Sequence, residues 1–289
     1  MASLPLPKSC SRLTPLYRGD LVQVDDWQCA GHDTGPPAEE WCGTEQFALT
    51  RRGAWAIETA GRWELAEAGT VTWWARNESY RVRHPVPGGD QCTVVRLTAA
   101  GTAALTPGEH RRPGRPVRRT LPVDGRTWLA HRVLLARAAR EGGDPLGLEE
   151  PTFALVRRVL AAPLPALPGH TAHAAVAAAR DYIARHWSSR LSLPVLARHA
   201  GCSPFHLGRL FRRELGTSLH RWVVRLRLRH GLERLLDQPD EIARIALDCG
   251  FASHSHFTDA FRGEYGVSPR EARRLACAGP GRQPASSRH

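Results

Sequence analysis

Residues 192–214 read SLPVLARHAGCSPFHLGRLFRRE, residues 240–264 read DEIARIALDCGFASHSHFTDAFRGE, and the two stretches repeat one pattern. In the first stretch, apolar residues recur at i, i+3, i+4 and i+7 from Leu193, which places them on one face of a helix. Gly201 can adopt the left-handed conformation that ends this helix, and Ser203 can cap the helix that follows. Two helices joined by a short turn that contains glycine form a helix-turn-helix, so the sequence predicts two such units.

The segment between the two units, residues 218–237, has a third helical pattern of apolar residues. At a rise of 1.5 Å per residue, this helix would be roughly 30 Å long. Successive major-groove faces of B-DNA lie ~34 Å apart. We therefore expect the connecting helix to present two recognition helices to neighbouring major grooves.

The same region contains a series of short motifs in a fixed order. They are Leu196-Ala197, Gly201-Cys202-Ser203, Leu207 and Arg209-Leu210-Phe211 in the first unit, and Ile242-Ala243-Arg244-Ile245-Ala246, Cys249-Gly250-Phe251, Ser255-His256-Phe257, Phe261 and Gly266-Val267-Ser268-Pro269 in the second. With these motifs, residues 173–275 resemble the DNA-binding domain of the AraC/XylS family of bacterial transcriptional regulators. The resemblance implies that the chain binds double-stranded DNA and that RNA polymerase is a partner.

Exposed positions on the two recognition helices are the candidate contacts to DNA. The candidate base contacts are Phe205, His206, Arg209, His254, Ser255, His256 and Asp259, and the candidate backbone contacts are Arg212, Arg213, Arg225, Arg262 and Arg270. Arg209 suits a bidentate contact to guanine, and Phe205 suits a thymine methyl group. Asp259 stands where relatives often carry a basic residue. Alternatively, the histidines are surface polar residues without a role in DNA recognition.

Length and charge agree with this interpretation. A chain of 289 residues fits two domains, and its net charge of +12 is unevenly placed. Residues 170–289 carry 19 arginines and ten acidic residues, so most of the excess lies with the predicted helix-turn-helix units, as phosphate binding requires. Nearly all basic residues are arginine, however, which also reflects a compositional bias. No apolar run is long enough to span a membrane and no secretion signal opens the chain, so we expect a cytoplasmic protein.

The N-terminal half predicts β-structure. Short runs rich in β-branched and aromatic residues, separated by glycine-containing turns, occur across residues 17–100 and indicate a sandwich or barrel. Many AraC/XylS members place a cupin-like barrel here that binds a small effector, and Ala68-Gly69-Thr70 with the segment from Tyr80 to Pro85 is similar to a cupin turn and strand. The clustered His-x-His and downstream Glu of metal-binding cupins are absent.

The fold class expected from these parts is α+β, with a cupin-like β-barrel and a helical pair followed by an all-α domain. The predicted domains are 1–105 for the sensor, 106–162 for a connecting loop and helical pair, 163–172 for a linker, 173–275 for DNA binding and 276–289 for a disordered tail. The helices predicted at 126–140 and 152–162 have apolar faces. Such a pair forms a homodimer interface in this family, or it packs on the barrel.

The chain has seven cysteines and no CxxC pair, and we expect them to be reduced. Cys29, His32, Cys42, His84 and Cys92 flank two loops that a closed barrel would bring to one end. Thiolate and imidazole groups suit a metal such as zinc, and paired thiols can sense oxidants. The alternative is that these cysteines are simple core residues beside tryptophan side chains.

Three classes of function fit the sequence to different degrees. The first is a DNA-binding transcriptional regulator controlled by a small effector in the N-terminal domain, and the second is a DNA-binding protein without an effector. The third is a cupin-type enzyme fused to a DNA-binding domain, but no GxSxG, HExxH or P-loop motif occurs. We therefore predict a regulator that is not an enzyme and that needs no cofactor.

Overall fold

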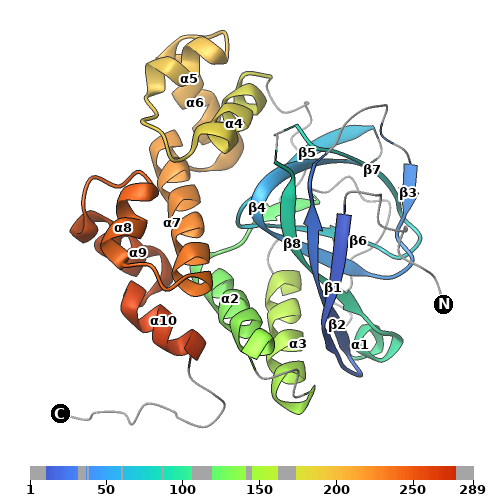
Figure 1. The fold of residues 1–289 in the computed structure, drawn as a ribbon. Coiled ribbons are helices and arrows are strands. Elements are labelled where there is room, and N and C mark those ends of the chain that lie inside the picture. The colour runs from blue at the N-terminus through green and yellow to red at the C-terminus, as the bar shows by residue number, and fades with distance from the viewer. Residues whose placement is uncertain are drawn as a thin grey trace.

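The computed structural model describes residues 11–31, 37, 39–59, 61–85, 88–105, 119–140, 145–161 and 174–277. Strands make up the N-terminal half and helices the C-terminal half (Figure 1). The strands are β1 Ser11–Arg18, β2 Val22–Cys29, β3 Glu39–Trp41, β4 Gln46–Thr59, β5 Arg62–Glu67, β6 Thr70–Trp74, β7 Ser79–Arg83, β8 Asp90–Leu97 and β9 Thr120–Pro122. The helices are α1 Ala99–Ala103, α2 Gly125–Arg140, α3 Pro145–Ala161, α4 Ala174–His186, α5 Leu193–His199, α6 Pro204–Leu215, α7 Leu219–Asp237, α8 Ile242–Asp248, α9 His254–Tyr265 and α10 Pro269–Cys277.

Strand β4 is the organising element of the sheet. Its first residues pair antiparallel with β8 and β6, and its last residues pair with β5 and β7. The register shifts between Thr50 and Arg52, and Gly53 follows with a φ of +71°. An irregularity of this kind bends a strand, so β4 leaves one set of neighbours and joins another.

The nine strands of the described residues form a sheet whose pairings do not close it, so the predicted cupin-like barrel is not confirmed. The main path runs β1-β2-β8-β4-β6-β9, with β5 and β7 paired to β4 and β3 paired to β7. The physical reason lies at the two ends of this path. Strand β9 has only three residues, and in the described part of the chain β1 pairs only with β2. The two end strands therefore do not pair with each other.

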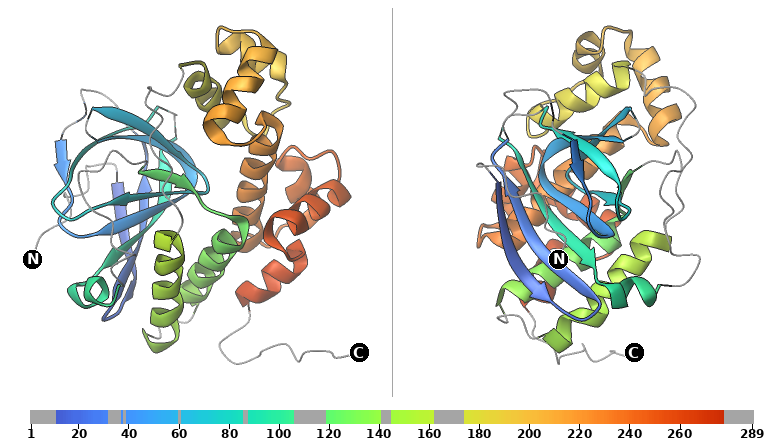
Figure 2. Two further views of the ribbon diagram at one scale, coloured as in Figure 1. Left: turned by 180° about the vertical axis from the view of Figure 1, so that it is seen from behind. Right: turned by 90° about the vertical axis from the view of Figure 1, so that its right-hand side faces the viewer.

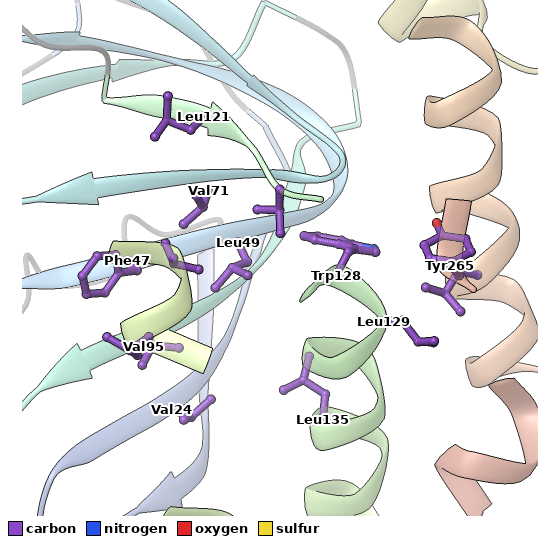
Figure 3. Packing of buried hydrophobic residues seen from close by; sticks show 14 of the residues in the cluster. Val24, Phe47, Leu49, Val71, Val95, Leu121, Trp128, Leu129, Leu135 and Tyr265 are labelled. Carbon is purple, nitrogen blue, oxygen red and sulfur yellow. The ribbon is translucent and has the colours of Figure 1, made fainter. Parts of the chain in front are cut away.

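Helix α2 packs against the face of the sheet that carries Phe47, Leu49 and Val71. Trp128 is completely buried and lies with these residues in one hydrophobic cluster (Figure 3). One turn later, His131 is hydrogen-bonded through Nε2 to the Thr93 hydroxyl at 2.9 Å. The opposite face carries a separate cluster that includes Trp55 and Trp74, and no residue of α2 belongs to it.

Helices α4 to α10 have the predicted double helix-turn-helix arrangement, with α7 between the two units (Figures 1 and 2). Helix α10 reaches Cys277 and buries Ala276, so the ordered domain extends beyond the boundary predicted at 275. Residues 106–118, 163–172 and 278–289, for which a loop, a linker and a tail were predicted, lie outside the described residues, as does His32. No helix in the described ranges is both long and apolar enough to cross a membrane.

The two halves of the chain share one hydrophobic core. The largest cluster runs from the sheet through α2 to Leu232 of α7 and to Phe257 and Tyr265 of the second helix-turn-helix unit. The first unit has its own cluster around Phe211, which contacts the sheet domain through Ala68. The apolar faces of α2 and α3, predicted either for dimerisation or for packing on the sheet, contribute Trp128, Leu135 and Val156 to this core, while Val133 and Leu134 are only partly buried.

Candidate nucleic-acid interface

Both recognition helices, α6 and α9, are set up by the same local device. The hydroxyls of Ser203 and Ser253 each accept a hydrogen bond, at 3.2 Å, from the backbone N–H three residues later. The turns before them contain Gly201 and Gly250, with φ of +66° and +77°. Because a left-handed backbone is costly for residues with a Cβ, glycine fits these positions. The caps and turns predicted from the repeated stretches are present.

Helix α7 joins the units through an arginine that touches both. The Arg227 guanidinium donates to the carbonyl oxygens of Trp187 at 2.9 Å and Ser189 at 2.7 Å, before the first unit. It also donates to the carbonyl oxygen of Gly250, in the turn of the second unit, at 2.8 Å. Three hydrogen bonds from one rigid, planar group fix the relative placement of the units on α7.

The exposed face of α6 combines an aromatic ring with arginines. Phe205 is 79% exposed, a high value for a large apolar side chain. The Arg209 guanidinium lies over its ring at 5.9 Å from the centroid, so the two predicted base contacts touch each other. Arg212 and Arg213 are exposed on the same helix, and His206 is partly buried. This surface offers a cation and an apolar ring together.

The exposed face of α9 is polar, with little positive charge. His254, Ser255, His256 and Asp259 are all exposed, as predicted. The His256 ring packs edge-on against Phe251 at 5.3 Å between centroids, which restricts its orientation. The second recognition surface therefore differs from the first in charge as well as in shape.

The predicted backbone contacts do not form one uniform group. Arg262 and Arg270 are exposed on the second unit. Arg225 is instead paired with Glu264, with 3.2 Å between Nε and Oε2, and this ion pair joins α7 to α9. Arg244 was not among the predicted DNA contacts, but its side chain is 74% exposed on α8 and lies 3.9 Å from Asp248. Its position one residue before the buried Ile245, on a different side of the helix, is the signal that would have identified it.

Buried arginines connect the DNA-binding region to the N-terminal half, and sequence patterns did not identify these contacts. Arg132 of α2 pairs with Glu233 of α7 at 2.6 Å, and both side chains are at most 2% exposed. Arg229 of α7 is buried and donates to the carbonyl oxygens of Gly69 and Val123. A charge is buried without large cost only when it is paired and hydrogen-bonded, so these contacts hold α7 in one position.

A third buried contact involves the first helix of the DNA-binding region. Arg180 of α4 donates to the Leu65 carbonyl oxygen at 3.0 Å and pairs with Glu67 at 3.1 Å. Burial raises the pKa of the Glu67 carboxyl above its ordinary value, and Arg180 opposes this shift. The sheet thus contacts both α4 and α7, the two elements from which the first recognition helix is supported.

The structure brings together only some of the predicted metal or redox residues. Cys29 and His84 lie close together with Asp90, which the patterns had not selected, and one ligand atom from each lies within 4.8 Å of the others. Cys92 is hydrogen-bonded to the other oxygen of Asp90 at 3.2 Å. Cys42 lies outside this group and donates to the Thr44 carbonyl oxygen at 2.8 Å.

The thiols of Cys42 and Cys29 differ in pKa. Burial raises the pKa of Cys42 to about 12, so Cys42 is an unreactive core thiol. Burial also acts on Cys29, but hydrogen bonds from His84 and the Gly31 amide outweigh it and lower the pKa of this thiol. Burial opposes the charge on His84, while hydrogen bonds to Asp90 and Cys29 raise its pKa to about 10.

The spaces that border the sheet differ in size. The space between the sheet and α2, beside His131, is only about 20 Å³, roughly the room for one water molecule. A cleft of about 780 Å³ opens where Cys29, Arg52 and Asp90 face the end of α4 at His186 and Trp187. A small ligand has room in this cleft.

Residues 196–275 match the protein family described as "Helix-turn-helix domain". The HTH-type transcriptional regulator GlxA of Rhizobium meliloti (strain 1021) is 36% identical over 104 residues, which are 36% of this chain and 32% of that protein. The HTH-type transcriptional activator RhaS of Escherichia fergusonii is 35% identical over 88 residues, 30% of this chain and 32% of that protein. The chain spans about a third of the length of the curated relatives it matches.

A solved structure with similarity to this chain is that of a transcriptional regulator from Chromobacterium violaceum, described by its AraC-type DNA-binding domain. It is 32% identical to this chain, and the match covers 37% of this chain and 95% of that one with a TM-score of 0.35.

Proposed function

We propose that this chain, which belongs to the AraC/XylS family through its C-terminal double helix-turn-helix domain, is a sequence-specific DNA-binding transcriptional regulator. The observation that carries the proposal is the pair of serine-capped helices, α6 and α9, held on one connecting helix with their outer faces exposed. Such a helix places its N-terminal residues against base edges in the major groove.

The length of α7 supports binding across two grooves. This helix has 19 residues and is therefore roughly 28 Å long, close to the ~34 Å between successive major-groove faces. Arg227 fixes both units relative to this helix. We expect α6 and α9 to enter neighbouring grooves on one side of the duplex, with α6 making the main contact to guanine through Arg209.

In this proposal the N-terminal half of the chain controls DNA binding. A small effector would bind in the cleft between the sheet and α4, because this cleft, of about 780 Å³, is large enough for a small molecule. A ligand there would touch α4 next to Trp187, whose carbonyl oxygen is bonded to Arg227. RNA polymerase as a partner and a homodimer follow from the family resemblance, and the partly exposed residues of α2 and α3, such as Val133 and Leu134, are the candidate dimer surface.

The test is a selection of bound sequences from random duplexes, followed by footprinting with the full chain. We expect one preferred sequence and protection of about 15 to 20 base pairs per monomer, which is somewhat under two turns of DNA. Protection limited to a single half-turn, or equal affinity for all duplexes, would contradict the proposal. The exposed Arg274 on α10 is a control position, since Arg274→Ala should leave the selected sequence unchanged.

A further inference from the structure

The strand register brings three metal-ligating side chains to one place. Cys29, the last residue of β2, lies directly opposite Asp90, the first residue of β8. His84 follows β7, and its Nε2 lies 2.9 Å from an Asp90 carboxylate oxygen. One ligand atom from each of the three lies within 4.8 Å of the other two. All three side chains are largely shielded from solvent.

The backbone around this cluster is closely packed. Gly89, with a φ of +70°, approaches the Cys29 carbonyl so closely that a Cβ would overlap it. A Cβ on Gly53 would overlap the Gly89 carbonyl oxygen in the same way. These two glycines allow β2, β4 and β8 to come together beside the cluster. The three side chains are therefore held on paired strands and not on a free loop.

We propose that Cys29, His84 and Asp90 form a binding site for one divalent cation of borderline softness, such as zinc. A tetrahedral zinc ion with ligand distances of about 2.0–2.3 Å needs its ligand atoms roughly 3.3–3.8 Å apart. The observed separations, 2.9 Å between His84 and Asp90 and at most 4.8 Å for the other pairs, require shifts of up to about 1 Å to reach these values. One thiolate, one imidazole and one carboxylate suit zinc, whereas magnesium and calcium prefer sites made of oxygen atoms.

Neighbouring groups orient the carboxylate ligand. The Cys92 thiol donates to the second oxygen of Asp90 at 3.2 Å and also lies 3.7 Å from the Thr50 hydroxyl. That hydroxyl accepts a hydrogen bond from the Trp55 indole at 3.0 Å. Such outer contacts fix a ligand's direction and tune its affinity for metal. They leave the first oxygen of Asp90 directed toward His84.

Three protein ligands leave the fourth tetrahedral position open, as in zinc sites that exchange a water or substrate molecule. Cys29 and Asp90 line the cleft that faces α4, so this position is accessible from the cleft. The metal site stands independently of the proposed function in DNA binding.

The test uses the reduced full chain, freed of metal by a chelator and titrated with cobalt(II) and then zinc(II). We expect one equivalent of cobalt to produce the charge-transfer absorption of a thiolate ligand, and zinc to displace it. Cys29→Ser should abolish this absorption, and Asp90→Asn should weaken cobalt binding by at least roughly tenfold. The double variant Cys202→Ser/Cys277→Ser removes thiols that are not buried and should keep the absorption.

Three outcomes would overturn the proposal. They are absence of thiolate absorption in the unmodified chain, its persistence in Cys29→Ser, and its loss in the Cys202→Ser/Cys277→Ser control. If Cys29→Ser does not fold, the cobalt absorption of the unmodified chain, of the Cys202→Ser/Cys277→Ser control and of His84→Gln tests the proposal instead. Loss of the absorption in folded His84→Gln supports the site, and unchanged cobalt affinity in that variant excludes it.

Discussion

The two helix-turn-helix units have nearly the same backbone design but different surroundings. The first unit packs around Phe211 in a cluster of its own, whereas the second unit packs around Phe257 in the cluster that continues through α2 into the sheet. Their outer faces differ too, since α6 presents Phe205 and Arg209 and α9 presents histidines and Asp259. One repeated sequence pattern thus supports a unit with a core of its own and a unit that shares its core with the N-terminal half.

This difference separates local from global determinants of structure. Serine caps and glycine turns act over a few residues, so they are the same in both units. The packing partners are set by the rest of the chain, and they decide how much stability each unit shares with the N-terminal half. Substitutions at matching positions of the two units should therefore have different consequences.

The largest effect is expected from the matched pair Phe211→Ala and Phe257→Ala. Both side chains are completely buried, and each loss should cost about 3–5 kcal/mol. Phe257→Ala should lower the free energy of unfolding of the whole chain, because its cluster includes the sheet. Phe211→Ala should unfold the first unit separately. Denaturant unfolding followed by hydrogen exchange distinguishes these results, and identical exchange patterns for the two variants would contradict the comparison.

The next effect concerns the buried ion pair that joins α2 to α7. Arg132→Ala leaves Glu233 buried without its partner and should cost about 3–5 kcal/mol in chemical denaturation. The double variant Arg132→Met/Glu233→Leu removes both charges and should recover most of this loss. A double variant as unstable as Arg132→Ala would show that packing, and not the unpaired charge, causes the effect.

The corresponding contact of the first unit is Arg180 with Glu67, and its loss should be pH-dependent. Without Arg180, burial raises the pKa of the Glu67 carboxyl further above the unfolded value than it is raised in the parent. The stability of Arg180→Ala relative to the parent should therefore be greatest at low pH and decline once the pH exceeds the raised pKa that Glu67 has in the parent. Unfolding curves at several pH values measure this, and a constant difference would show that Glu67 does not gain a proton.

The sequence predicted the elements that are set by residues close together in the chain. Ser203, Gly201 and their counterparts gave the helix-turn-helix units, and strand patterns identified β4 to β8 within the N-terminal half. It did not predict that the sheet stays open, because closure depends on strands such as β9, whose three residues carry no distinct pattern. Asp90 was missed as a partner of Cys29 because their contact depends on the pairing of β2 with β8.

A smaller effect, about 1–3 kcal/mol, is expected for Arg209→Ala on the preferred DNA sequence. This loss should be confined to one base pair, and binding to random DNA should change little. The loss of DNA affinity should be smaller for His256→Ala, because the imidazole ring packs on Phe251 and cannot make the bidentate contact to guanine that an arginine makes. Mobility-shift titrations on single-base variants of the preferred site measure both. A larger loss for His256→Ala would reverse the assignment of the main reading helix.

The smallest effects concern single phosphate contacts. Arg213 of the first unit has a 66% exposed side chain that lies 3.7 Å from Glu214 on its own helix, and Arg262 of the second unit is exposed as well. Each contact to a phosphate releases about 0.9 counterion equivalents, so Arg213→Ala and Arg262→Ala should each lower the slope of log affinity against log salt by ~0.9. Arg225→Ala provides the matched control, because Arg225 is already paired with Glu264 and should leave the slope unchanged. Binding titrations over a range of salt concentrations measure all three slopes. A reduced slope for Arg262→Ala but not for Arg213→Ala would mean that the second unit makes the stronger backbone contact. Arg262, and not the exposed histidines of α9, would then hold the polar recognition face against the DNA.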